Sequence, residues 1–338
     1  LVPPGPGVRM ASVDDGRIGL RELLGFLLGI LRDGYRVFAL AGRYASPLYY
    51  ELAKMPQRHC MFAALCQRYA FDRFWGRDDY NFDHIIRTHE IRAAGGRSFG
   101  INHGLPTPEI INPSWRYIDF DLYYVFGSHL YEKYYAKTWA AGMQVRAIGT
   151  MGLSRTMIER RQPARQNTIV YFSAATYGEE TLLVALETAR ALPHREFLIK
   201  IKNSRRADGR ADKQIEMCAD SPANVTITER DTYELLLEAE YALAGCTTVV
   251  AEAVQLGAKT FVLDRLPKSL PFYYRDFAEI CVRSGTEAAD RIKAIDEGTE
   301  EYPWESLNAL VDRSGRNPYD TIREDMGLPA LARARALT

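Results

Sequence analysis

Short apolar runs alternate with helix-like stretches across the second half of this 338-residue chain. Residues 168–172 (TIVYF) and 197–202 (FLIKIK) have the β-branched and aromatic content of strands, and residues 179–192 between them have helical spacing. The same alternation continues through residues 225–228, 232–239, 241–244, 249–256 and 260–263. Strands that alternate with helices are typical of a parallel sheet, because each parallel crossover needs a connecting element. This half is therefore predicted to be a doubly wound α/β domain.

The first half has the same rhythm in a less regular form. Residues 98–104, 121–127 and 145–149 are predicted strands that end in polar or glycine-containing turns, and residues 130–141 form a predicted helix. At roughly 100–200 residues per domain, the chain length predicts two domains. We place a Rossmann-type domain at residues 1–152, a linker rich in arginine at 153–167, and a second such domain at 168–338, whose last helices could cross back.

The region before the first predicted sheet contains a leucine-rich helix. Residues 16–34 carry apolar side chains at helical spacing: Leu20, Leu23, Leu24, Leu27, Leu28 and Leu31. Lysine and arginine are sparse on its polar face, so docking on a protein core is favoured over lying on a membrane surface. A strand over residues 35–40 and a helix over residues 47–54 are predicted to follow.

Composition narrows the function classes. Lysine and arginine total 43 and match 43 aspartates and glutamates, so the chain lacks the global charge of a dedicated nucleic-acid binder. The longest apolar stretch, residues 20–31, is too short and too interrupted to cross a membrane. Five cysteines without a CxxC pair favour reduced thiols and a cytoplasmic location, at most at the inner face of a membrane. Dinucleotide, Walker-A, zinc-protease and serine-hydrolase motifs are all missing.

The turn Gly245-Cys246-Thr247-Thr248 is the strongest candidate for a ligand site. It joins a predicted strand to a predicted helix, where free backbone N–H groups and the helix dipole favour a phosphate. Glu252, one helical turn further on, is within reach of a ribose diol. An alternative stays open on spacing alone: Thr248 could cap the helix, with Glu252 interacting with its dipole.

A resemblance supports the ligand interpretation. Residues 231–264, DTYELLLEAEYALAGCTTVVAEAVQLGAKTFVLD, resemble the nucleotide-sugar-binding half of GT-B glycosyltransferases. They are most similar to the branch with CDP-glycerol glycerophosphotransferases, polysialyltransferases and Kdo-type surface-polysaccharide transferases. Residues 168–176, 197–203 and 99–104 resemble that family more weakly. The resemblance implies a GT-B-like fold, with two Rossmann-type domains facing a central cleft, and a glycosyltransferase that needs neither a metal nor another cofactor.

The resemblance also implies a donor site on the second domain. Relatives often carry a His-Pro pair after the strand at 197–202, where this chain has Lys202, Asn203 and Arg205, which could take over recognition of the donor phosphate. Lys202, nearest the carboxyl end of the strand, is expected to offset charge on the leaving phosphate. The full set of predicted donor-binding residues is Ser173, Thr176, Lys200, Asn203, Arg205, Gly245, Thr247, Thr248 and Glu252.

The expected catalytic base lies on the first domain. The sequence Asn102-His103-Gly104 resembles the His-Gly turn of the family's acceptor half, and a neutral imidazole there could accept the proton of an acceptor hydroxyl. His89 and Glu109 are rival bases. Asp119 and Asp121 are further alternatives, although they are more typical of a strand start.

Together these features predict transfer of a sugar, or a glycerol-phosphate-like unit, from a CMP, CDP or UDP donor. The expected acceptor is a carbohydrate or glycolipid in bacterial surface polysaccharide or glycoconjugate synthesis, and no nucleic-acid partner is expected. Peripheral membrane association and further domains of a larger polypeptide stay open. Two alternatives remain: a non-hydrolysing nucleotide-sugar epimerase, and a non-catalytic nucleotide- or glycan-binding domain.

Overall fold

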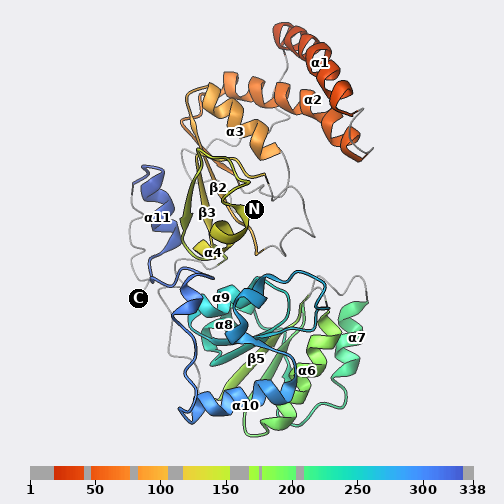
Figure 1. The fold of residues 1–338 in the computed structure, drawn as a ribbon, viewed down its shortest axis with the longest axis vertical. Helices are drawn as coiled ribbons and strands as arrows, with labels where there is room; N and C mark the ends of the chain where they lie inside the picture. Colours follow the sequence, from red (N-terminus) through yellow and green to blue (C-terminus); the bar gives the residue numbers. More distant parts are fainter. Residues whose placement is uncertain are drawn as a thin grey trace. The chain divides into compact units, whose positions relative to one another are not determined.

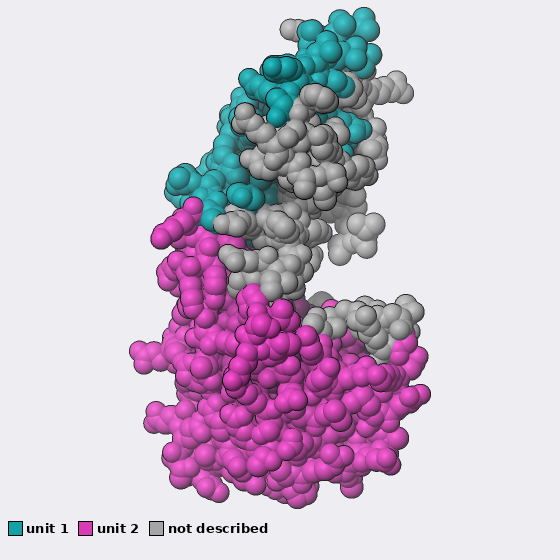
Figure 2. Space-filling view, turned by 45° about the vertical axis from the view of Figure 1, so that its right-hand side comes forward, with its two compact units in different colours: residues 1–101, 114–123, 138–144 teal, residues 102–113, 124–137, 145–338 magenta. Residues whose placement is uncertain are grey.

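The protein contains two β-sheets, each accompanied by helices (Figure 1). The computed structural model describes residues 19–41, 47–76, 83–105, 117–152, 167–174, 177–202 and 209–329. The chain divides into two compact units (Figure 2): residues 1–101, 114–123 and 138–144 form unit 1, and residues 102–113, 124–137 and 145–338 form unit 2. The domain boundaries drawn from the sequence stay a prediction.

Unit 1 begins with two long helices, α1 (Leu20–Ala41) and α2 (Pro47–Arg68), which pack against each other. The strand predicted for residues 35–40 is wrong, because α1 continues through them. The helix predicted for 47–54 is too short, because α2 continues past Pro56. Docking of α1 on a core through its leucines is also wrong, because the six predicted leucines are 42–76% exposed.

The first sheet has the strand order β1-β2-β3-β4. Its strands are β1 (Arg73–Gly76), β2 (Arg97–Ile101), β3 (Leu122–Val125) and β4 (Gln144–Ala147). Helix α3 (Asp83–Ala93) joins β1 to β2, which pair in parallel. The helix predicted for residues 130–141 is replaced by a short α4 (Ser128–Leu130), a π-helix (Tyr131–Tyr135) and a turn.

The second sheet lies wholly in unit 2, and all of its strands are parallel, in the order β10-β9-β8-β5-β6-β7. The strands are β5 (Thr168–Phe172), β6 (Glu196–Lys200), β7 (Val225–Ile227), β8 (Tyr241–Ala244), β9 (Lys259–Leu263) and β10 (Cys281–Val282). Every residue of β5 and β8 is buried, as expected for central strands covered on both faces.

Helices cover both faces of this sheet (Figure 1). Helices α6 (Gly178–Ala191), α7 (Arg210–Met217) and α10 (Gly285–Asp296) contribute to one apolar core, while α8 (Thr232–Glu238) and α9 (Val249–Leu256) contact β5, β8 and β9. Phe172 is paired in register with both Lys200 and Ala244. Three strands therefore end at the same level, and the loops that follow them meet at one edge.

The last helix of the described residues is α11 (Pro318–Asp325), which Asn317 caps by accepting from the N–H of Tyr319 at 3.0 Å. Asp325 accepts from the hydroxyl of Tyr124 at 3.0 Å and from Arg146 Nη1 at 2.6 Å. These bonds attach α11 to other segments of unit 2. None of the described helices has both the length and the apolar content needed to cross a bilayer.

Candidate functional site

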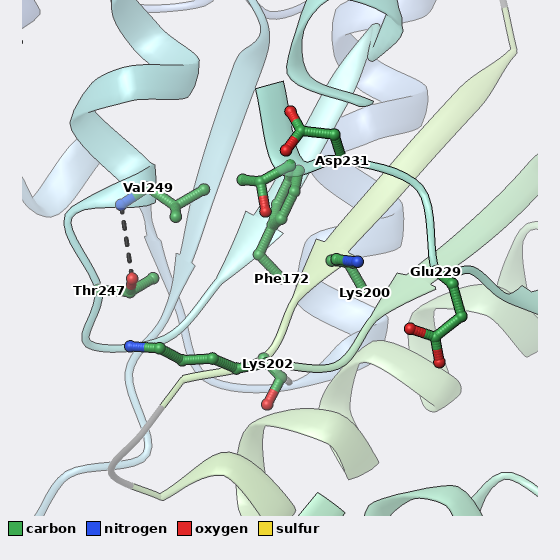
Figure 3. A pocket seen from close by; sticks show the side chains of 9 residues that line it. Phe172, Lys200, Lys202, Glu229, Asp231, Thr247 and Val249 are labelled. Carbon is green, nitrogen blue, oxygen red and sulfur yellow. Dashed lines mark hydrogen bonds between the residues drawn. The ribbon is translucent and has the colours of Figure 1, made fainter. Parts of the chain in front are cut away.

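A cavity of about 440 Å³ opens at the carboxyl edge of the six-stranded sheet, over the ends of β5, β6, β7 and β8 (Figure 3). Ligands of open α/β sheets bind at this edge. We call it the lysine cavity, and define it by the residues that line it: Phe172, Ser173, Lys200, Lys202, Glu229, Asp231, Thr232, Thr247 and Val249.

Two cations enter the cavity from the end of β6. Lys200 is the last residue of the strand, and Lys202 follows two residues later, so both can project toward the same side. Figure 3 shows Lys202 pointing toward the loop that carries Thr247. Among the described residues, no carboxylate forms an ion pair with either lysine. Both ammonium groups are therefore available to an anionic ligand.

The start of α9 contributes hydroxyl and amide groups. Thr247 Oγ1 and the Val249 N–H are 3.5 Å apart, a weak contact, and both residues line the cavity (Figure 3). Thr248 occupies the cap position, but its side chain makes no capping bond; instead Thr248 Oγ1 accepts from the Leu105 N–H at 3.3 Å. Side-chain capping by Thr248, the alternative left open by the sequence, is therefore wrong. The N–H groups of Val250 and Ala251 donate to the carbonyl oxygens of Thr247 and Thr248 at 3.3 and 2.9 Å, so this helix end offers a ligand chiefly the positive end of its dipole.

Gly245 lies in a tight place between β8 and α9. A Cβ there would lie 3.0 Å from Thr181 Cγ2 and 3.1 Å from the Cβ of Ala174. The absence of a side chain thus lets the turn approach the start of α6. Ser173, which also lines the cavity, is buried, and its hydroxyl donates to Gln214 Oε1 at 2.7 Å. Ser173 therefore presents an oriented oxygen.

The turn that carries His103 lies beside the start of α9, within unit 2. Asn102 is buried, and its Oδ1 accepts from the Gly104 N–H at 2.9 Å, which fixes the turn. A Cβ on Gly104 would lie 3.2 Å from Thr248 Oγ1, so the turn and the helix start are close neighbours. His103 itself is exposed. The structure thus brings the predicted base turn and the predicted phosphate turn together.

Glu252 does not line the lysine cavity. Its Oε1 accepts from the hydroxyl of Tyr233 at 3.1 Å, and burial raises the pKa of its carboxyl group. Gly152 makes room for this pair, because a Cβ there would lie 2.0 Å from the Tyr233 hydroxyl and 2.8 Å from Glu252 Oε1.

The alternative catalytic bases either lie away from the turn of His103 or are held in ion pairs. His89 is exposed in the middle of α3, not at a helix start, and belongs to unit 1. Asp119 and Asp121 both pair with Arg92, at 2.8 and 2.7 Å. Bonds from the N–H of Ser98 and from Arg92 lower the pKa of Asp121. The two aspartates are therefore structural. Four predicted site residues lie outside the described residues: Thr176, Asn203, Arg205 and Glu109.

Sequence reasoning missed the part of the cavity that follows β7. Glu229, Asp231 and Thr232 line the cavity there. Asp231 also caps α8, because its Oδ1 accepts from the Tyr233 N–H at 2.8 Å. The signal that could have found these residues is their position after a predicted strand, since all parallel strands end at the same edge. Across the described ranges, no group of histidine, cysteine or carboxylate side chains is arranged to hold a metal ion.

Comparisons with known proteins define the fold. No protein-family model matches the sequence, and no curated protein sequence matches it. Among solved structures, UDP-GlcNAc 2-epimerase from Neisseria meningitidis bound to UDP-GlcNAc is similar, with a TM-score of 0.51 and 12% identity over 83% of this chain and 82% of that one. A putative UDP-N-acetylglucosamine 2-epimerase from Listeria monocytogenes has a TM-score of 0.52 and 10% identity, over 80% and 78%.

A glycosyltransferase from Rickettsia africae has a TM-score of 0.44 and 12% identity, over 82% of each chain. At these identities the similarity concerns the fold alone. The two sheets and the similarity to the two epimerase structures confirm the predicted fold class: the chain has a GT-B-like α/β fold with two Rossmann-type sheets.

Proposed function

We propose that this protein is a glycosyltransferase that binds a nucleotide-activated sugar in the lysine cavity. The observation that carries the proposal is the cavity itself, where Lys200, Lys202 and the amide end of α9 converge at the carboxyl edge of a parallel sheet. Two ammonium groups and the positive end of a helix dipole suit the phosphate groups of a nucleotide donor. The UDP-GlcNAc held by the N. meningitidis epimerase makes nucleotide sugars the ligand class to test first.

The proposed reaction moves one sugar and one proton. The acceptor hydroxyl oxygen attacks the anomeric carbon of the donor, the bond from that carbon to the phosphate oxygen breaks, and the nucleotide leaves with the bonding electrons. His103 takes the proton of the hydroxyl. Lys202 and the amides of α9 offset the negative charge that develops on the leaving phosphate. Ser173, Lys200, Gly245, Thr247 and Thr248 complete the proposed donor site, with Glu252 assigned to the ribose and the turn of Asn102 and Gly104 to the acceptor side.

A CMP, CDP or UDP donor and a carbohydrate or glycolipid acceptor are part of this proposal. So is a mechanism without a metal, in which the protein's own cations meet the leaving group. The epimerase remains the second candidate, because the N. meningitidis and L. monocytogenes structures, each with a TM-score above 0.5, carry that description.

Product analysis separates the candidates. The chain is incubated with labelled CMP, CDP and UDP sugars, with and without a glycan acceptor, and the label is followed by chromatography. Label on the acceptor, reduced at least tenfold in Lys202→Ala but not in Lys293→Ala, is the expected result. A converted sugar nucleotide formed without acceptor would identify an epimerase, and bound but unchanged donor would identify a binding domain.

A further inference from the structure

A second cavity, of about 430 Å³, lies at the same edge of the six-stranded sheet. It opens over the ends of β9 and β10, beside the start of α6. We call it the arginine cavity; its charged lining residues are Arg265, Lys268, Arg275, Arg283, Asp264 and Glu180. It shares no lining residue with the lysine cavity, so the ligand proposed above leaves it unexplained.

One ion pair builds the frame of this cavity. Arg275 donates from Nε to Asp264 Oδ2 at 2.7 Å and from Nη2 to Asp264 Oδ1 at 2.9 Å. It also donates to the carbonyl oxygens of Leu266 at 2.8 Å and Leu270 at 2.7 Å. The Asp264 side chain is only 2% exposed. The pair thus neutralises itself and fixes the loop after β9.

The other three cations that line the cavity are Arg265, Lys268 and Arg283. Among the described residues, Arg265, Lys268 and Arg283 form no ion pair, and all three are exposed. Arg265 Nη1 donates to the carbonyl oxygen of Arg283 at 3.1 Å, which joins the loops that follow β9 and β10. Two arginines and a lysine are therefore held around one cavity by a fixed frame.

Two further carboxylates, Glu187 and Glu287, lie near these cations but do not line the cavity. Bonds from Gly285 and Thr286 and the charge of Arg265 lower the pKa of Glu187, and Glu287 Oε2 accepts from the Arg283 N–H at 2.7 Å. Glu187 lies further along α6, and its oxygens accept from the Gly285 N–H at 2.8 Å and the Thr286 hydroxyl at 3.0 Å. With Asp264 paired to Arg275, Glu180 is the acidic side chain left among the lining residues, against three cations. The residues that line the cavity therefore carry a net positive charge.

The start of α6 adds to this charge. Tyr177 occupies its N-cap position and makes no side-chain capping bond, and it also lines the cavity. The first amides of this 14-residue helix are thus not bonded by a capping side chain, at the positive end of the helix dipole.

We propose that the arginine cavity binds the oxyanion of a small phosphorylated or carboxylated sugar. Guanidinium groups present paired donors that match the oxygens of a phosphate or a carboxylate, and the lysine adds a mobile point charge. A cavity of this volume has room for a monosaccharide beside the anion. The proposal does not rest on the function assigned to the lysine cavity.

The test is a titration of the ¹⁵N-labelled full chain followed by TROSY spectra. Inorganic phosphate, glucose 6-phosphate and glucuronate are added in separate series, which distinguishes phosphate from carboxylate as the source of the oxyanion. We expect saturable shifts of the Arg265, Lys268 and Arg283 amides with at least one of the three. The dissociation constant should rise roughly tenfold or more in the double variant Arg265→Gln/Arg283→Gln, which removes two charged donors.

A matched double variant removes the same charge elsewhere on unit 2. Arg190 and Lys293 are exposed and line neither cavity, so Arg190→Gln/Lys293→Gln should bind the oxyanion like the unaltered chain. Equal weakening in both double variants would overturn the proposal, because it would show a diffuse effect of net charge. So would the absence of saturation with all three ligands. Since the titration needs neither donor nor transfer, its result is independent of the failure or success of the glycosyltransferase assay.

Discussion

The two cavities of the six-stranded sheet are similar in size but different in chemistry. Their volumes are about 440 and 430 Å³, and both lie where parallel strands end. The lysine cavity is lined by two lysines and two carboxylates beside the start of α9. The arginine cavity is lined by four cations, one of which is paired with a buried aspartate. The sheet therefore positions both cavities at its carboxyl edge, and the side chains of the loops determine which ligand each cavity can bind.

The largest expected effect tests whether the chemistry belongs to the lysine cavity. His103 lies in the turn next to Thr248, so His103→Ala should lower the rate of sugar transfer by about 10²–10⁴-fold, the usual contribution of a general base. Donor affinity, measured by calorimetry, should change little. His89→Ala serves as the control, because His89 is exposed on α3 of unit 1. A normal rate of sugar transfer by His103→Ala would show that the catalytic base does not lie in this turn.

The next effect concerns the frame of the arginine cavity. Asp264→Ala leaves the Arg275 guanidinium without its counterion and the loop after β9 without its anchor, and should lower the free energy of unfolding by about 2–3 kcal/mol. Urea denaturation measures it. The matched control is Glu324→Ala, which breaks the exposed pair with Arg316 and should cost about 0–1 kcal/mol. Equal losses of unfolding free energy in the two variants would show that the Asp264–Arg275 pair stabilises the loop after β9 no more than an exposed ion pair does.

A third prediction sharpens the role of the α9 turn. Thr247→Ala/Thr248→Ala should weaken binding of the true donor by about 1–3 kcal/mol, the scale of hydrogen bonds to a charged group. Isothermal titration calorimetry measures the affinity, and Thr226→Ala, at an exposed position of β7, is the control. Unchanged affinity in a folded double variant would leave the turn with a structural role only.

The smallest effect involves pH. Burial raises the pKa of Glu252 in the folded chain, so the folded state holds this proton more tightly than the unfolded state does. The resulting stabilisation is present at low pH and is lost as pH rises from the unfolded pKa through the folded one. Glu252→Gln should therefore flatten the decline of unfolding free energy with rising pH above about pH 4. Urea denaturation across that range measures the slope, and an unchanged slope would contradict the assignment.

The sequence predicted five strands of the six-stranded sheet and missed only the two-residue β10, whereas the prediction for the N-terminal region was poor. Residues 168–172 and 241–244 are continuous apolar runs between turn signals, and only buried central strands satisfy such runs. The strand prediction for residues 35–40 was wrong because Tyr35, Val37 and Phe38 favour strands and Gly34 has the character of a helix end. Gly34 is in fact tolerated within α1, where its missing Cβ faces open space, and local propensity gives way to the longer helix.

The candidate site was predictable where it followed strand ends. Ser173, Lys200, Lys202 and Thr247 all lie at or just after the end of a predicted strand, and they line one cavity. The environment of Glu252 could not be read, because it depends on Tyr233 and Gly152, which are distant in sequence. The arginine cavity was missed for a similar reason: its cations come from two loops joined only by the fold.

The measurement that tests the central claim most directly is a calorimetric titration of CMP, CDP, UDP and their sugars into the full chain and into Lys200→Ala/Lys202→Ala. The account predicts that one nucleotide series binds with saturation, and that the double variant weakens it roughly tenfold or more, while Arg190→Gln/Lys293→Gln binds normally. Normal nucleotide binding by Lys200→Ala/Lys202→Ala, or no binding of any nucleotide by the unaltered chain, would contradict the placement of a nucleotide-sugar donor in the lysine cavity.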